Sequence, residues 1–209
     1  MKQIDIENWK RKEQFNFFYR ADYPQYNICM NIDATNFLAF VKNNKLSFYY
    51  SMIYAVTRIA NEMDDFRYRI RDGKVFLHDT VHPSFTDLNE TEEDPFKLVT
   101  VDYKDDLLEF IQQAKEISVN QHQFIDFSVL EGRDDFLYIT CIPWISFTHV
   151  SYTFSLNRND SVPRISWGKY FREGEKVMLP FSVQVHHALI DGYMVGKYVE
   201  KLQKFLDNC

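Results

Sequence analysis

Cysteine is scarce in this sequence. The chain of 209 residues has only Cys29, Cys141 and Cys209, which stand far apart and form no Cys-x-x-Cys pair. Disulfide frameworks and structural zinc sites need cysteines in even numbers or at close spacing. We therefore expect neither a disulfide framework nor a metal site. Reduced thiols of this kind are typical of a cytoplasmic protein.

Glycine and proline are also few, and long apolar runs are missing. The six glycines and six prolines are scattered, with no linker, repeat or low-complexity tract between them. The N-terminus lacks the apolar stretch of a signal peptide. The longest apolar region, at about residues 48–60, is interrupted by Ser51, Thr57 and Arg58 and is too short to span a bilayer. We expect residues 1–209 to form one domain with no membrane partner.

Positive charge is limited as well. The formal net charge is −6, and the only basic run is Lys10-Arg11-Lys12. A protein that binds the phosphate backbone of nucleic acids normally presents a basic face. The sequence therefore predicts no nucleic-acid partner.

Aromatic residues, in contrast, are plentiful at 17% of the chain, and they suit both strands and binding pockets. Apolar periodicity predicts helices that begin after Thr35, run over 47–62 and 105–121, and begin again near Gly192. Strands are expected at 26–32, 68–70, 75–78, 97–103, 136–142, 145–154, 164–170 and 177–187. This irregular order predicts an α+β fold with helices packed on a large mixed β-sheet.

The segment 177–192 carries the most chemical information. Because alternate side chains of a strand share a face, His187 lies on an apolar stripe with Val183 and Val185, while His186 points to the other face. Partial removal from water lowers the pKa of a histidine and favours the neutral ring, which can accept a proton. His187 is therefore a candidate general base.

The residues after this histidine pair would hold such a base in place. Asp191 follows His187 by four residues, and Gly192 permits a sharp change of chain direction into the last helix. The plainer interpretation is that His186 and His187 are two structural strand histidines. A shared metal ion is not expected, because neighbouring strand residues face opposite sides and no third ligand stands at a recognisable spacing.

The run from His186 to Gly192 resembles the His-His-x-x-x-Asp-Gly signature of the chloramphenicol acetyltransferase family. Similar matches extend along almost the whole chain. They are the opening Trp9-Lys10-Arg11-Lys12-Glu13-Gln14-Phe15, the step Ile32-Asp33-Ala34-Thr35, Pro143-Trp144, Gly168-Lys169-Tyr170 and the approach from Gly174 to Pro180. Related acyltransferases share the histidine signature, but the combination is specific. The resemblance implies the two-layer α+β fold of this family and a homotrimer with active sites between subunits.

The resemblance also implies direct acetyl transfer from acetyl-CoA to a hydroxyl of chloramphenicol in a ternary complex, which confers antibiotic resistance. His187 would act as the general base. Thr140 stands where the family has a serine that stabilises the oxyanion; threonine keeps the donor but adds a methyl group. Ser166 takes the place of a second hydroxyl, which acts through water. Asp191 would pair with Arg11 to fix geometry rather than to relay charge.

The remaining family positions concern substrate binding. Those that resemble pocket aromatics of the acceptor site are Phe17, Phe18 and Phe127, with Tyr138 and Ser166 beside them. Trp144 and Ser166 are predicted to contact the coenzyme.

The acceptor pocket also departs from the family. Residues 21–26 are more polar than the family pattern, and Asp87 replaces an apolar residue. Two alternatives therefore stay open: an acetyltransferase for another hydroxylated small molecule, and a catalytically silent relative that binds a ligand or partner in the same cleft. A lipoamide transacylase ranks below both, since no lipoyl domain or flexible linker is evident.

Overall fold

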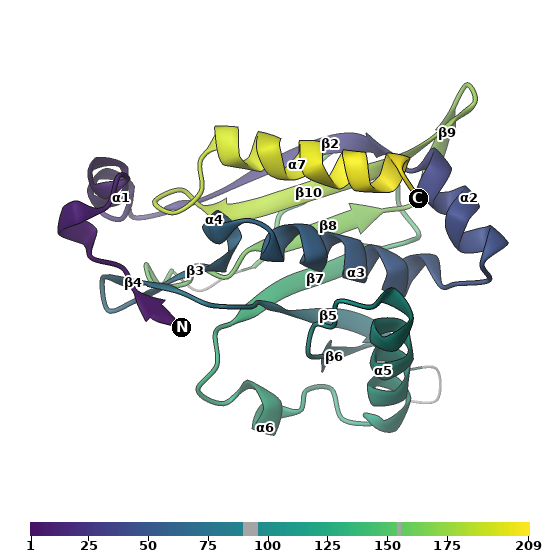
Figure 1. Cartoon of the computed structure of the whole chain (residues 1–209), viewed down its shortest axis with the longest axis horizontal. Helices are drawn as coiled ribbons and strands as arrows, with labels where there is room; N and C mark the ends of the chain where they lie inside the picture. Colours follow the sequence, from purple (N-terminus) through teal and green to yellow (C-terminus); the bar gives the residue numbers. More distant parts are fainter. Residues whose placement is uncertain (90–95, 154–155) are drawn as a thin grey trace.

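A seven-stranded mixed sheet forms the centre of the protein in the computed structural model, which describes residues 1–89, 96–153 and 156–209 (Figure 1). The spatial order is β2-β10-β8-β7-β5-β6, and the short β9 pairs with β10. The strands are β2 (Gln25–Asp33), β5 (His82–Leu88), β6 (Phe96–Thr100), β7 (Phe136–Ile142), β8 (Arg164–Gly168), β9 (Phe171–Glu173) and β10 (Lys176–His186).

The sheet is mixed because it contains both parallel and antiparallel pairs of strands. The long strand β10 runs antiparallel to β2, β8 and β9, and β6 runs antiparallel to β5. In the middle of the sheet, β7 is parallel to both β5 and β8. A separate three-stranded sheet, in the order β1-β4-β3, consists of Lys2–Gln3, Lys74–Leu77 and Tyr68–Arg71.

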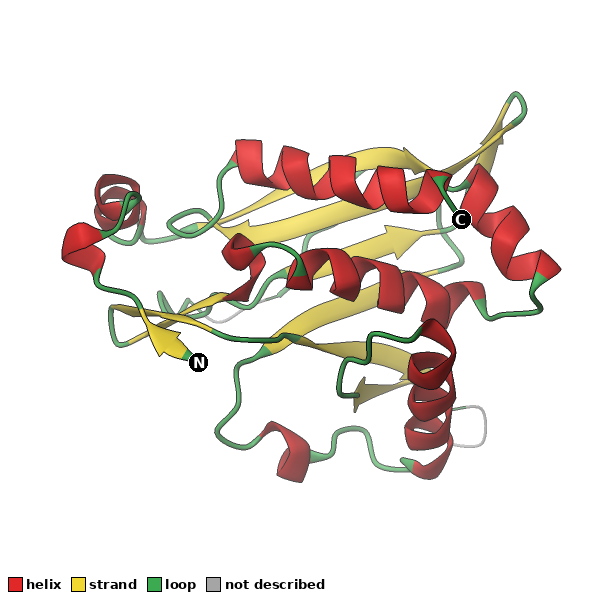
Figure 2. Ribbon diagram, viewed as in Figure 1, coloured by secondary structure: helices red, strands yellow, loops and turns green. Residues whose placement is uncertain are grey.

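Helices cover one face of the large sheet and create two layers (Figure 2). The longer ones are α2 (Thr35–Asn43), α3 (Phe48–Asn61), α5 (Leu107–Asn120) and α7 (Gly192–Asp207). The short ones are α1 (Lys12–Phe18), α4 (Asp64–Arg67), α6 (Phe127–Leu130) and the 3-10 helix η1 (Ile6–Asn8). The central helix α3 packs between α5 and α7 and lies on β5 and β7. The hydroxyl of Ser47 caps α3 by accepting a hydrogen bond from the Tyr50 amide.

The two faces of β10 differ in chemistry although both are buried. Phe181, Val183 and Val185 face the helices, as strand alternation requires. The other face carries Ser182, Gln184 and His186, all at most 2% exposed. The chain after the Pro143-Trp144 turn covers part of this polar face: the Asn27 side chain donates to the carbonyl of Val150 at 2.5 Å.

The predicted α+β fold with a mixed sheet and the four longer helices is confirmed. The strand predicted at 145–154 is wrong, because residues 145–153 form turns and loops; Phe154 lies outside the described residues. The reason is a close approach between two backbones. A Cβ on Gly168 would lie 2.5 Å from the carbonyl oxygen of Ile145, so this segment folds against the end of β8 instead of extending.

Strand β5 was not predicted, since Pro83 and the polar residues after it weaken its strand pattern. The predicted strands at 97–103 and 177–187 are shifted slightly, to Phe96–Thr100 and Lys176–His186. In the described part of the chain, no helix combines the length and the apolar content needed to cross a bilayer. That residues 1–209 form one domain stays a prediction.

Candidate active site

His186 is a fully engaged structural histidine. Its side chain is 2% exposed, and its Nδ1 accepts a hydrogen bond from the Ala188 amide at 3.2 Å. Since Nδ1 accepts, Nε2 carries the hydrogen of the neutral ring and donates to the Arg158 carbonyl at 3.1 Å. Burial lowers the pKa of His186 to about 4, against the opposing effect of the Arg158 carbonyl. Both ring nitrogens are therefore occupied and the ring stays neutral.

His187 differs from its neighbour in the state of its ring nitrogens. It lies in the turn after β10, half-buried, and its backbone amide donates to the Pro24 carbonyl at 2.8 Å. The ring stacks on Phe18, with centroids 3.7 Å apart and planes 8° apart, and also contacts Tyr26. Nδ1 is buried and has no hydrogen-bond partner among the described residues, whereas Nε2 is not among the buried unpaired atoms there. Nε2 is therefore the candidate to accept a proton from a substrate.

An ion pair holds the turn that follows. Nη1 of Arg11 lies 3.0 Å from Oδ2 of Asp191, and the Arg11 side chain is only 7% exposed. Oδ1 of Asp191 accepts from the Met194 amide and so caps α7. Burial works to raise the pKa of Asp191, but the bonds from Arg11 and the Met194 amide outweigh it and lower the pKa. The pair implied by the resemblance is present, and its effect on the reaction stays a prediction.

Gly192 does not provide the sharp change of chain direction that the sequence predicts for it. It is the first residue of α7, and it is not among the positive-φ glycines, which are Gly73, Gly132 and Gly174. The Asp191 cap, rather than glycine freedom, turns the chain into the helix.

Thr140 and Ser166 lie side by side on the sheet face that the helices do not cover. They are opposite each other in the parallel β7–β8 register, and Ser166 is opposite Ser182 in β10. A cavity of about 290 Å³ opens over them. We call it the polar cavity, and it is lined by Ser84, Leu98, Tyr138, Ile139, Thr140, Tyr152, Thr153, Arg164 and Ser166.

A larger and mostly apolar cavity of about 660 Å³ lies at the ends of β5 and β7. Thr140 lines it as well, and so does Trp144, which is 67% exposed. Asp87 contributes a carboxylate, which Tyr50 and Ser118 hold with hydroxyl hydrogen bonds of 2.5 and 2.7 Å. Thr140 therefore borders both cavities, and the predicted role of its hydroxyl stays a prediction.

Within one chain the base candidate and this hydroxyl are far apart. Thr140, Ser166 and Ser182 form one row across the sheet, and His187 follows Ser182 by five residues. At about 3.4 Å per strand residue, this corresponds to a separation of roughly 17 Å along the strand direction. The structure thus brings His187 together with Phe18, and Thr140 together with Ser166, but does not bring the two groups together.

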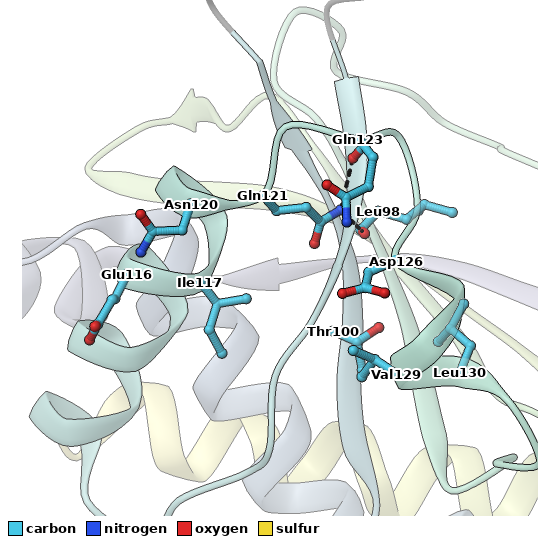
Figure 3. A pocket seen from close by; sticks show the side chains of 10 residues that line it. All are labelled: Leu98, Thr100, Glu116, Ile117, Asn120, Gln121, Gln123, Asp126, Val129 and Leu130. Carbon is cyan, nitrogen blue, oxygen red and sulfur yellow. Dashed lines mark hydrogen bonds between the residues drawn. The ribbon is translucent and has the colours of Figure 1, made fainter.

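Two of the predicted pocket aromatics are exposed. Phe17 and Phe127 each have 73% of their surface accessible, and Phe127 lies on α6 at the far edge of the fold. A third cavity, of about 310 Å³, lies between α5, β6 and α6 (Figure 3). None of the predicted site residues lines it, and the side chain of Gln121 donates to the carbonyls of Leu98 and Gln123 at its rim.

Sequence analysis missed six residues of the polar cavity, among them Tyr152 and Arg164. Tyr152 belongs to the segment wrongly predicted as a strand, and Arg164 begins β8 with no pattern to distinguish it from a surface charge. No group of three or more histidine, cysteine, aspartate or glutamate side chains that could hold a metal ion occurs within residues 1–89, 96–153 and 156–209.

The fold is shared with acetyltransferases. A solved structure named chloramphenicol acetyltransferase superposes with a TM-score of 0.89 at 30% identity, covering 98% of this chain and 100% of that one. A dihydrolipoamide acetyltransferase from Azotobacter vinelandii superposes with a TM-score of 0.70 over 93% and 85% of the two chains; at 16% identity it shows a common fold alone.

The sequence comparisons define the family. The family model described as Chloramphenicol acetyltransferase matches residues 1–203, so the chain belongs to the chloramphenicol acetyltransferase family. A chloramphenicol acetyltransferase from a Klebsiella species is 32% identical over 205 residues, which cover 98% of this chain and 93% of the relative.

Proposed function

We propose that this protein transfers the acetyl group of acetyl-CoA to a hydroxyl of chloramphenicol, with antibiotic resistance as the result. Nε2 of His187 accepts the proton of the substrate hydroxyl while that oxygen attacks the thioester carbonyl. The hydroxyl of Thr140 donates to the resulting oxyanion. When the tetrahedral intermediate collapses, the sulfur of coenzyme A leaves and takes the proton back from His187.

One observation carries this proposal. Of the two adjacent histidines, His186 has both ring nitrogens engaged, whereas the His187 ring makes no hydrogen bond with the described residues. Stacking on Phe18 and the backbone bond to Pro24 fix the position of the His187 ring. A ring fixed in this way supports the role of general base that we propose for it.

We further propose that the protein acts as a cytoplasmic homotrimer in which each site uses residues of two subunits. The separation of roughly 17 Å between His187 and Thr140 along the sheet supports this arrangement, because one chain alone cannot bring both to a single substrate. The exposed rings of Phe17 and Phe127 are also suited to contacts between subunits.

The test is thiol release from acetyl-CoA in the presence of chloramphenicol. His187→Ala should lower kcat by about 10²–10⁴-fold, the usual contribution of a general base. His122→Ala is the matched control, because His122 is exposed and is not among the residues that line the three cavities. A His187→Ala rate equal to that of the wild type would exclude the mechanism.

Subunit mixing tests the shared site. His187→Ala and Thr140→Ala chains are each expected to be poorly active, but co-refolded mixtures should regain activity. In a mixed ring, one interface combines the intact histidine of one chain with the intact threonine of its neighbour. Activity that stays at the level of the separate variants would place each site within one chain.

The second candidate is acetylation of another hydroxylated small molecule. It is favoured by the polar residues at the site, Asp87 in the larger cavity and Arg164 in the polar cavity. A panel of alcohols assayed by thiol release separates it from the first candidate. A catalytically silent relative would release no thiol with any of them.

A further inference from the structure

Tyr152 has a buried hydroxyl that lies near Ser166 and Thr140 but forms no hydrogen bond with the described residues. Its ring lines the polar cavity together with Thr140 and Ser166. The phenol oxygen is buried, yet it makes no hydrogen bond of acceptable geometry with any residue in the described segments. Buried hydroxyls in proteins are nearly always paired, so an unpaired one at a cavity wall indicates a ligand group that completes it.

The state of this phenol makes it a donor. Burial raises the pKa of Tyr152 above its usual value, and the nearby hydroxyls of Ser166 and Thr140 offset this only in part. The phenol therefore keeps its proton at neutral pH. A neutral phenol can donate one hydrogen bond to an oxygen of a bound molecule.

The charged side chain that lines the cavity, Arg164, is already engaged. Arg164 donates to Asp160 at 2.6 Å and to the Val162 carbonyl at 3.2 Å, so that its charge is balanced within the protein. Its guanidinium also lies 5.6 Å from the ring centre of Tyr138. The cavity thus offers an unused neutral donor but no unpaired charge, which suits an uncharged polar molecule.

We propose that Tyr152 is a specificity-determining residue that donates a hydrogen bond to an oxygen on the body of the acceptor alcohol. This assignment rests on the proposed function, since it requires that the alcohol occupies the polar cavity while Thr140 serves the oxyanion. The favoured acceptors are neutral alcohols that carry a second oxygen, such as an amide carbonyl or another hydroxyl, in addition to the one that is acetylated.

The test is Tyr152→Phe, which removes the hydroxyl and keeps the ring. Binding of chloramphenicol is measured by calorimetry, and steady-state kinetics follow thiol release. We expect the Kd and KM for chloramphenicol to rise about tenfold, as the loss of one hydrogen bond to a ligand predicts. The KM for acetyl-CoA should not change, and the Tm of the free protein should not fall, because the lost hydroxyl makes no hydrogen bond with the described residues.

Tyr193→Phe is the matched control, because Tyr193 is 70% exposed on α7. A chloramphenicol Kd within twofold of the wild type in Tyr152→Phe overturns the assignment of Tyr152 alone. Binding of chloramphenicol by the wild type without thiol release overturns the proposed function alone, since the Kd of the variant still decides the role of Tyr152. No binding of chloramphenicol by the wild type overturns both.

Discussion

The ion pair between Arg11 and Asp191 yields the most quantitative prediction. Two variants separate its charge from its capping role. Asp191→Asn keeps a side-chain oxygen that can cap α7 but removes the negative charge. Asp191→Ala removes both. The Arg11 side chain, at 7% exposed, then keeps a buried positive charge without its carboxylate.

The magnitudes follow from the burial of the two partners. Breaking a buried ion pair from one side costs about 3–5 kcal/mol, and the lower end applies because the Asp191 side chain is 34% exposed. Asp191→Asn should therefore lower the free energy of unfolding by about 3 kcal/mol. Asp191→Ala should lose about 1 kcal/mol more, the usual value of an N-cap. Nε and Nη2 of Arg11 are buried without a hydrogen-bond partner among the described residues, and Asp65 interacts with Arg11 without an ion pair between them there, so the charge is only partly compensated.

The assay is equilibrium urea unfolding at a fixed protein concentration, because the stability of an oligomer depends on concentration. The pKa of Asp191 is lowered in the folded protein, so its contribution is present at neutral pH and is lost as the pH falls below about 4. The Asp191→Asn variant should lack this loss. An Asp191→Asn protein within 0.5 kcal/mol of the wild type at pH 7, by the scale of an ordinary surface substitution, would refute the reasoning.

Two further predictions concern stability. Gly168→Ala places a Cβ 2.5 Å from the Ile145 carbonyl oxygen and should lower the free energy of unfolding in urea by about 1–3 kcal/mol. Gly196→Ala meets nothing within 4 Å and should stabilise α7 by about 0.5–1 kcal/mol. Equal effects of the two substitutions would show that the backbone contact at Gly168 is not tight. Because the pKa of His186 falls from 6.5 to about 4 on folding, the unfolded chain binds its proton first as the pH drops, and stability should decrease by about 3 kcal/mol between these values. His186→Gln should flatten that part of the pH profile, and a profile as steep as that of the wild type would rule out His186 as its source.

Local signals were sufficient for the helices. The helix predicted at 47–62 is α3, Phe48–Asn61, because Ser47 caps it and its apolar residues recur at helical spacing. Long-range contacts decide the places where prediction failed. The segment after Trp144 has the composition of a strand, yet the missing side chain of Gly168 lets it fold against β8. No pattern within residues 145–154 encodes that contact.

Only part of the candidate site could be predicted from the sequence. Strand alternation placed His186 and His187 on opposite faces, but it could not show which ring keeps a free nitrogen. That depends on the carbonyl of Arg158, which is distant in the sequence. The resemblance supplied the Arg11–Asp191 pair, which spacing alone would never connect. Tyr152 could not be predicted as a site residue, because only the folded structure places it beside the other residues of the polar cavity.

The polar residues on one face of β10 indicate that this sheet is not optimised for stability alone. Its helix-facing residues form an apolar core, whereas Ser182, Gln184 and His186 bury polar atoms on the other face. Such atoms lose hydration and need partners. Ser182 donates to Asn27 and His186 to Arg158, but Nε2 of Gln184 has no partner within the described residues.

If this second face were apolar, it would bury the same area without polar atoms that need hydrogen-bond partners. The polar row instead continues across the sheet from Ser182 to Ser166 and Thr140, the residues that line the polar cavity. One face of the sheet therefore holds the fold together, while the other carries the hydroxyl groups that we propose meet a substrate. Substituting the second face with apolar residues should raise stability and abolish acetyl transfer, because the two properties reside on opposite sides of the same strands.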